Sequence, residues 1–146
     1  MKKALGLFLI VCLLSQFAVG CSNTRTSNAE GIDVDLTELS SILVYAEVYN
    51  MVTHPDDYLG KTIKMSGPYF SSYSDQTGQY YHAVIIEDAT ACCQSGLLFI
   101  WNGEHHYPDD YPETQTKIEV VGVFKQYDEP DQTYCYLAVD DITILT

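Results

Sequence analysis

The ten residues KTIKMSGPYF, numbered 61–70, decide the fold of this chain. Apolar or small residues alternate with polar ones along them, and Ile63, Met65, Gly67 and Tyr69 share one side. Because successive side chains of a strand point to opposite faces, this alternation predicts a strand with one face in a core. We therefore expect a mainly β domain whose first long strand begins here.

Four later segments also have the composition of strands, with many β-branched or aromatic residues and turn residues at their ends. They are residues 80–87, 97–101, 117–126 and 134–145, the last of them bent near Asp140-Asp141. The connection 102–116 is the longest, and two prolines make it unsuitable for a long helix. Five strands are thus predicted, with the longest connection between the third and the fourth.

One helix is predicted before the strands, at residues 35–53. Asp35 and Glu38 have the spacing of a capping box, and the pair His54-Pro55 ends the helix. Apolar residues recur at steps of three and four and form one stripe: Leu39, Ile42, Leu43, Ala46, Tyr49 and Val52. We expect this helix to cover one open end of a barrel.

One helix and five short strands in this order resemble an OB-fold, a small Greek-key barrel. Gly67 and Gly122 fall inside predicted strands, where a barrel needs tight bends. The fold class is therefore mainly β (α+β by content), a five-stranded OB-fold-like barrel with an N-terminal helix over residues 34–146. A small sandwich or an open antiparallel sheet with a packed helix remains the alternative.

Two segments of the sequence resemble a known family. They are PDDYLGKTIKMSG (55–67) and EDATACCQSGL (87–97), which are similar to an uncharacterised family of bacterial lipoproteins with an OB-fold-like domain and a Cys-Cys pair after the second strand. The resemblance extends over roughly residues 35–145. It implies a fold and a place in the cell envelope, and no established activity.

The first residues of the chain indicate where the protein works. Two lysines precede an apolar run from Ala4 to Leu14, and Ala18-Val19-Gly20 precede Cys21. This pattern predicts a signal peptide over residues 1–20, too short to remain as a membrane span. The Cys resembles that of a bacterial lipobox, which implies a lipid on the Cys21 thiol; an ordinary secretion signal is the alternative. Residues 21–33 are then a flexible tether, and the protein is anchored to the cell membrane or outer membrane, facing outside the cytoplasm.

The net charge of the chain is −13. Without residues 1–20, five Lys/Arg remain against twenty Asp/Glu, which gives −15. Such acidity argues against a nucleic-acid partner, which needs a basic surface. It suits a cation or a basic partner, or it serves solubility alone.

If residues 1–20 are removed and Cys21 is lipidated, three of the five cysteines remain: Cys92, Cys93 and Cys135. Cys135 is either a small buried hydrophobe or the partner of Cys92 or Cys93 in a disulfide. Thiolates together with imidazoles would instead form a zinc or copper(I) site. The residues considered for such a site are Cys92, Cys93, Cys135, His82, His105 and His106.

Signals of catalysis are weak. The sequence has no nucleophile elbow, no H-E-x-x-H motif and no Gly-rich phosphate loop, so we expect no enzyme. The favoured function is a binding or accessory module for a small ligand, an envelope component or a transporter. A soft-metal lipoprotein and a thiol-redox protein are the alternatives. Tyr80, Tyr134 and Tyr136 either line a ligand groove or fill a sheet.

Overall fold

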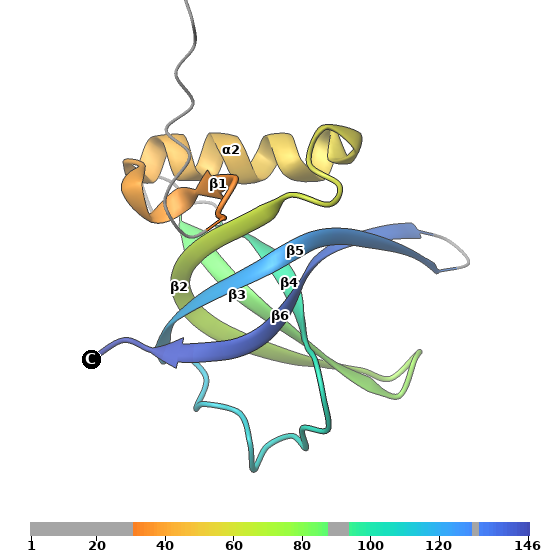
Figure 1. The fold of residues 1–146 in the computed structure, drawn as a ribbon. Helices are drawn as coiled ribbons and strands as arrows, with labels where there is room; N and C mark the ends of the chain where they lie inside the picture. The colour runs from red at the N-terminus through yellow and green to blue at the C-terminus, as the bar shows by residue number, and fades with distance from the viewer. Residues whose placement is uncertain (1–30, 88–93, 130–131) are drawn as a thin grey trace, which may run out of the picture.

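The computed structural model describes residues 31–87, 94–129 and 132–146 (Figure 1). The strands are β1 (Val34–Asp35), β2 (Thr62–Ser74), β3 (Gln79–Glu87), β4 (Gln94–Trp101), β5 (Lys117–Glu129) and β6 (Gln132–Ile144). Five of them close a barrel in the order β2-β3-β4-β6-β5, with β5 paired back to β2. The β4–β6 pair is parallel and the other barrel pairs are antiparallel. The five predicted strands and the OB-fold-like barrel are confirmed, and the open sheet is excluded.

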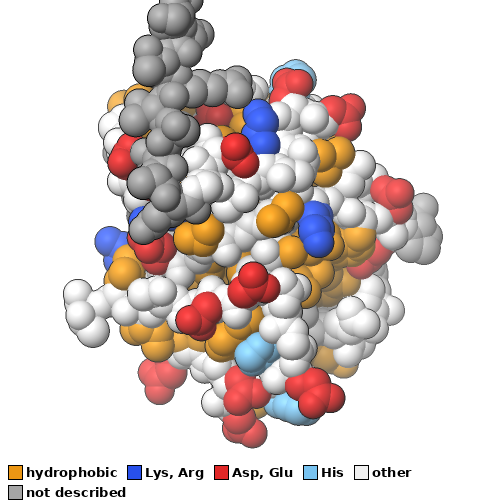
Figure 2. Space-filling view, in the orientation of Figure 1, with side chains coloured by type: hydrophobic (Ala, Val, Ile, Leu, Met, Phe, Trp, Pro, Cys, Tyr) orange, Lys and Arg blue, Asp and Glu red, His pale blue; other side chains and the backbone are white. Residues whose placement is uncertain are grey.

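The two long hairpins of the barrel, β2–β3 and β5–β6, project to the same side (Figure 1). The connection 102–116 contains no helix, as predicted, and covers the end of the barrel opposite the helix (Figure 1). Figure 2 shows acidic side chains spread over the visible face and hydrophobic ones gathered close to the β5–β6 hairpin. The hairpins thus border a partly apolar surface on an acidic molecule.

The helical segment differs in part from the predicted single helix over 35–53. A 3-10 turn, η1 (Leu36–Glu38), is followed by extended backbone at Leu39 and Ser40, and only then does α2 (Ser41–Thr53) begin. Asp35 accepts a hydrogen bond from the Thr37 amide at 2.9 Å, so it caps the 3-10 turn and not the α-helix. The predicted end is confirmed, because His54 is the C-cap and η2 (Pro55–Asp57) follows. None of these described helices is both long and apolar enough to cross a membrane.

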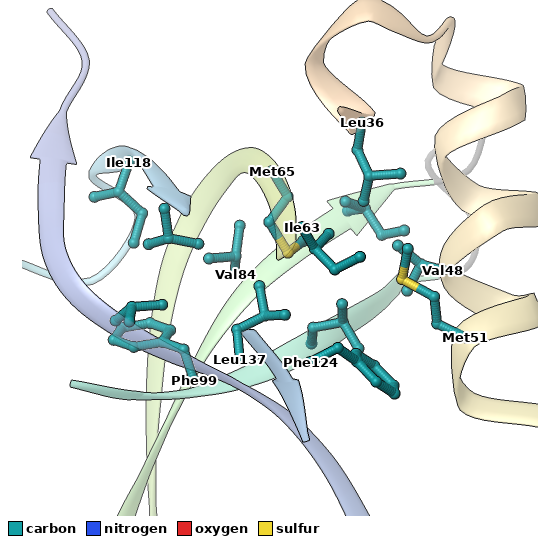
Figure 3. Close-up of a cluster of buried hydrophobic side chains, with 14 of the residues drawn as sticks. Leu36, Val48, Met51, Ile63, Met65, Val84, Phe99, Ile118, Phe124 and Leu137 are labelled. Carbon is teal, nitrogen blue, oxygen red and sulfur yellow. The ribbon is translucent and has the colours of Figure 1, made fainter. Parts of the chain in front are cut away.

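The helix α2 lies across one end of the barrel, as expected, but it does not bury the predicted stripe (Figure 1). Val48 and Met51 are fully buried and point toward Ile63 and Phe124 (Figure 3). Ile42 is 64% exposed, and the other stripe residues are exposed as well. The prediction was wrong because α2 is apolar nearly all round, so two of its faces fit a period of 3.6 residues.

The alternation of β2 is confirmed, since Ile63, Met65 and Tyr69 are fully buried. Gly67 lies between them, where a Cβ atom would stand 2.2 Å from the Ile85 carbonyl oxygen of β3. Only glycine therefore allows the two strands to approach so closely.

The predicted bend of the last strand is a β-bulge. Val120 pairs with Ile142 and Gly122 with Val139, so two residues of β6, Asp140 and Asp141, oppose one residue of β5. A bulge of this kind bends and twists the strand that carries the extra residue. It also frees the Asp140 carbonyl for the contact with Trp101 described below.

The first described residues already belong to the folded unit. Ile32 is buried, and Asp33 exchanges hydrogen bonds with Thr62 through its amide (2.9 Å) and its carboxylate (2.8 Å). The first described residues therefore lie beside the start of β2.

Candidate functional site

The candidate site is a groove bordered by the two hairpins, over β3 and β4. Its volume is about 380 Å³, which is within the range of small-molecule sites. Most of its lining side chains are aromatic. The complete lining consists of Gln79, Tyr80, Tyr81, His82, Leu98, Phe99, Ile100, Trp101, Tyr111, Tyr127, Glu129 and Tyr136.

The deep part of the groove is an aromatic cluster around His82. The His82 ring stacks on Tyr111, with ring centroids 4.0 Å apart, and its Nδ1 atom lies 2.8 Å from the Tyr69 hydroxyl. Burial lowers the pKa of His82 to about 4 and raises the pKa of Tyr69 to about 12. At neutral pH the imidazole is therefore uncharged, and the direction of its hydrogen bond with the Tyr69 hydroxyl is set by its tautomer.

The connection 102–116 brings Tyr111 and Tyr107 to this cluster. The Tyr107 hydroxyl accepts a hydrogen bond from Ser71 at 3.0 Å, and its ring lies 4.3 Å from that of Tyr80. An irregular segment thus supplies two of the rings that close this end of the barrel.

Trp101, at the end of β4, forms one wall. Its indole N–H donates to the Asp140 carbonyl at 3.2 Å, and His105 stacks on its face with ring centroids 3.8 Å apart. The Tyr111 ring meets it nearly at a right angle, 89°, at 5.5 Å. The hydrogen bond and the stacking fix the orientation of the Trp101 ring.

The opposite wall joins β3 to the β5–β6 hairpin. The Tyr81 hydroxyl donates to the Glu129 carboxylate at 2.9 Å. Tyr127 meets Tyr136 at an angle of 61° and stacks on Tyr134, with centroid distances of 5.6 and 5.4 Å. Burial raises the pKa of Tyr127 to about 12, so this wall is uncharged except for Glu129.

Two of the three tyrosines predicted for a ligand groove, Tyr80 and Tyr136, line this groove, and the third, Tyr134, stacks on Tyr127. That these tyrosines contact a ligand stays a prediction. The sequence analysis missed Trp101, Tyr111 and Glu129. The connection 102–116 brings Tyr111 to the groove and the β5–β6 hairpin brings Glu129, and neither path can be read from a local pattern. The available signal was Trp101, the single tryptophan of the chain, at the end of a predicted strand.

The residues predicted for a metal site are not brought together where the structure describes them. His82 is inside the aromatic cluster, His105 lies on Trp101, and the exposed His106 is 3.8 Å from Asp110. Within the described ranges no three His, Cys, Asp or Glu side chains are placed to hold an ion. Cys21, Cys92 and Cys93 lie outside those ranges, so the lipid, metal and disulfide predictions for them stay predictions.

Cys135 is half-buried and packs against the hydrophobic core, and its alternative role as a disulfide partner of Cys92 or Cys93 stays a prediction. Burial raises the pKa of its thiol, which disfavours the nucleophilic thiolate. In the ladder it lies opposite Gln126 of β5.

Fold and groove together define the chain as an OB-fold-like barrel with an aromatic face between its hairpins. Among solved structures it is similar to the dimeric N-terminal domain of the PriB protein from Thermoanaerobacter tencongensis. The identity is 14%, the TM-score is 0.37, and the similarity covers 58% of this chain and 96% of that one. No model of a known protein family matches the chain, and no curated protein is significantly similar to it.

Proposed function

We propose that this protein is a lipid-anchored binding module that works outside the cytoplasm and holds a small ligand in the groove between its hairpins. The observation that carries the proposal is the position of the groove. OB-folds bind their ligands on the second and third barrel strands, between the loops that join strands one to two and four to five. In this chain those elements are β3, β4 and the two hairpins that border the groove.

The chemistry of the lining supports binding of an organic molecule. Rings and aliphatic side chains supply apolar area, while Glu129, Gln79, His82 and the tyrosine hydroxyls supply polar groups. A concave surface that combines apolar area with oriented polar groups is a usual form of a small-molecule site.

The N-terminal sequence supports the proposed location. A lipid on Cys21 would leave ten residues before Gly31, which extend to at most about 35 Å. The module would then stay near the cell membrane or outer membrane, where it could serve an envelope or transporter protein. The acidic surface argues against nucleic acid as the ligand.

The test is a thermal-shift screen of the full-length chain, purified in a non-ionic detergent, against sugars, amino acids, nucleosides and ammonium compounds. A ligand of the native state raises the melting temperature. Two isoleucines provide matched variants: Ile100 lines the groove and is 47% exposed, whereas Ile144 lies elsewhere and is 57% exposed. We expect Ile100→Lys to abolish the shift and Ile144→Lys to retain it. Shifts that survive equally in both variants would place binding outside the groove and contradict the proposal.

A further inference from the structure

The described lining of the groove contains a negatively charged side chain and no positively charged one. Glu129 is the charged side chain among its described lining residues, and no Lys or Arg is among them. The Tyr81 hydroxyl, 2.9 Å away, holds the carboxylate at the border of the groove. Lys125 is the ladder partner of Tyr136, but it is exposed and does not line the groove. A positively charged ligand therefore meets attraction and no opposing cation in the lining.

His82 does not alter this balance at neutral pH. Its half-buried ring packs against Tyr69, Phe99 and Tyr111, and this burial lowers its pKa to about 4. An uncharged imidazole adds no net charge to the groove.

The rings of the groove are arranged in two corners. Trp101 and Tyr111 meet at 89°, and Tyr127 and Tyr136 meet at 61°. The faces of Trp and Tyr rings carry negative electrostatic potential and attract cations, and rings set at an angle can present two faces to one site. Such corners are the geometry with which aromatic cages hold methylated ammonium groups.

Other classes of ligand fit less well. An anion would be placed beside Glu129 in a chain of net charge −13. A neutral sugar could stack on the rings and donate hydroxyl hydrogen bonds to Glu129, but it carries no positive charge for the carboxylate to attract. The field of the whole acidic protein, in contrast, raises the local concentration of cations.

We propose that the groove selects a small organic ammonium ion, held by the aromatic corners and by Glu129. This inference rests on the proposed function, because it names the ligand class of the same site. A free ammonium compound fits better than a phospholipid headgroup, whose phosphate would be brought to the acidic border.

The test compares two isosteric probes that differ in charge, choline and 3,3-dimethylbutan-1-ol. Each is titrated into the full-length chain in a non-ionic detergent, and the fluorescence of Trp101, the single tryptophan, reports occupancy. We expect choline to bind at least about tenfold more tightly than the neutral alcohol. Glycerophosphocholine, which carries the same ammonium group, represents a phospholipid headgroup, so its binding would also support the inference. Tighter binding of choline would indicate a free ammonium compound as the ligand, and tighter binding of glycerophosphocholine would indicate a headgroup.

Neighbouring carboxylates provide the matched variants. Glu129→Gln removes the groove charge, whereas Asp128→Asn changes a residue that bonds Thr133 and does not line the groove. We expect a loss of about tenfold in choline affinity for the first variant and no change for the second, with equal melting temperatures checked beforehand.

Two results would overturn the inference without overturning the binding module. One is equal affinity for choline and for the alcohol; the other is no choline binding while a neutral ligand still binds in a manner sensitive to Ile100→Lys. If no compound shows sensitivity to Ile100→Lys, the proposed function fails as well.

Discussion

The hydroxyl of Tyr69 lies 2.8 Å from Nδ1 of His82, between neighbouring strands at the barrel end that the connection 102–116 covers. Both rings belong to the aromatic cluster, and Tyr69 is fully buried. Protonation of His82 therefore costs free energy, because it places a charged imidazole where water solvates it poorly.

This arrangement makes stability depend on pH. The pKa of His82 is about 4 in the folded protein and about 6.5 in an unfolded chain, so the unfolded state binds more protons between these values. Stability is fully present above pH 6.5 and is lost as the pH falls toward 4. We expect a loss of about 1–2 kcal/mol from this group, discounted for its partial exposure. Urea midpoints between pH 7 and pH 4 measure it.

His82→Asn is the diagnostic variant, because it removes the titrating group and keeps a polar atom near the Tyr69 hydroxyl. Its stability should fall less over the same range than that of the natural chain. His106→Asn is the control, since the His106 side chain is exposed. Parallel curves for all three proteins would mean that His82 does not titrate as its burial indicates.

Gly67 provides a test of how tightly the barrel closes. In Gly67→Ala the new methyl group would stand 2.2 Å from the Ile85 carbonyl oxygen, and backbone atoms must move to relieve the clash. We expect a loss of about 3 kcal/mol in the free energy of unfolding, measured in urea. Ser72→Ala, at an exposed position of the same strand, should change it by less than about 0.5 kcal/mol. A stable Gly67→Ala variant would show that β2 and β3 can separate without cost.

The strands could be predicted from the sequence because their alternation is a local signal. Every second residue of β2 is buried from Ile63 to Tyr69, as the pattern of this segment requires. A bend near Asp140-Asp141 was likewise predicted, and in the structure it takes the form of a β-bulge. The short strand β1 was missed because two residues carry no period.

The groove could be predicted only in part, because its walls meet through long-range pairing. Tyr81 and Glu129 are 48 residues apart, and their contact depends on the curvature of both hairpins. Stacking of Tyr111 on His82 depends on the path of an irregular connection. Composition alone indicated that tyrosines matter, without deciding which of them face a common space.

The face of α2 that meets the barrel can be tested with two valines four residues apart. Val48 is fully buried, whereas Val52 is 41% exposed on the predicted but incorrect stripe. Val48→Ala should lower the free energy of unfolding by about 2 kcal/mol, since it removes two buried methyl groups and leaves a cavity. Val52→Ala should change it by no more than about 0.5 kcal/mol. The reverse order, measured by urea unfolding, would assign the buried face to the stripe of Leu39, Ile42 and Val52.

The stacking of His105 on Trp101 predicts a spectroscopic change. The two rings are nearly parallel, 12° apart, so His105 shields one face of the indole from water. In His105→Ala this face becomes solvated, and because the excited indole is stabilised by polar surroundings, the emission maximum should move to longer wavelength. The signal is assignable because Trp101 is the single tryptophan. His106→Ala should leave the spectrum unchanged, since His106 contacts Asp110 instead. A shift of equal size in both variants would indicate that either substitution alters the conformation of the connection 102–116. No shift in either variant would contradict the stacking of His105 on Trp101 that forms this wall of the groove.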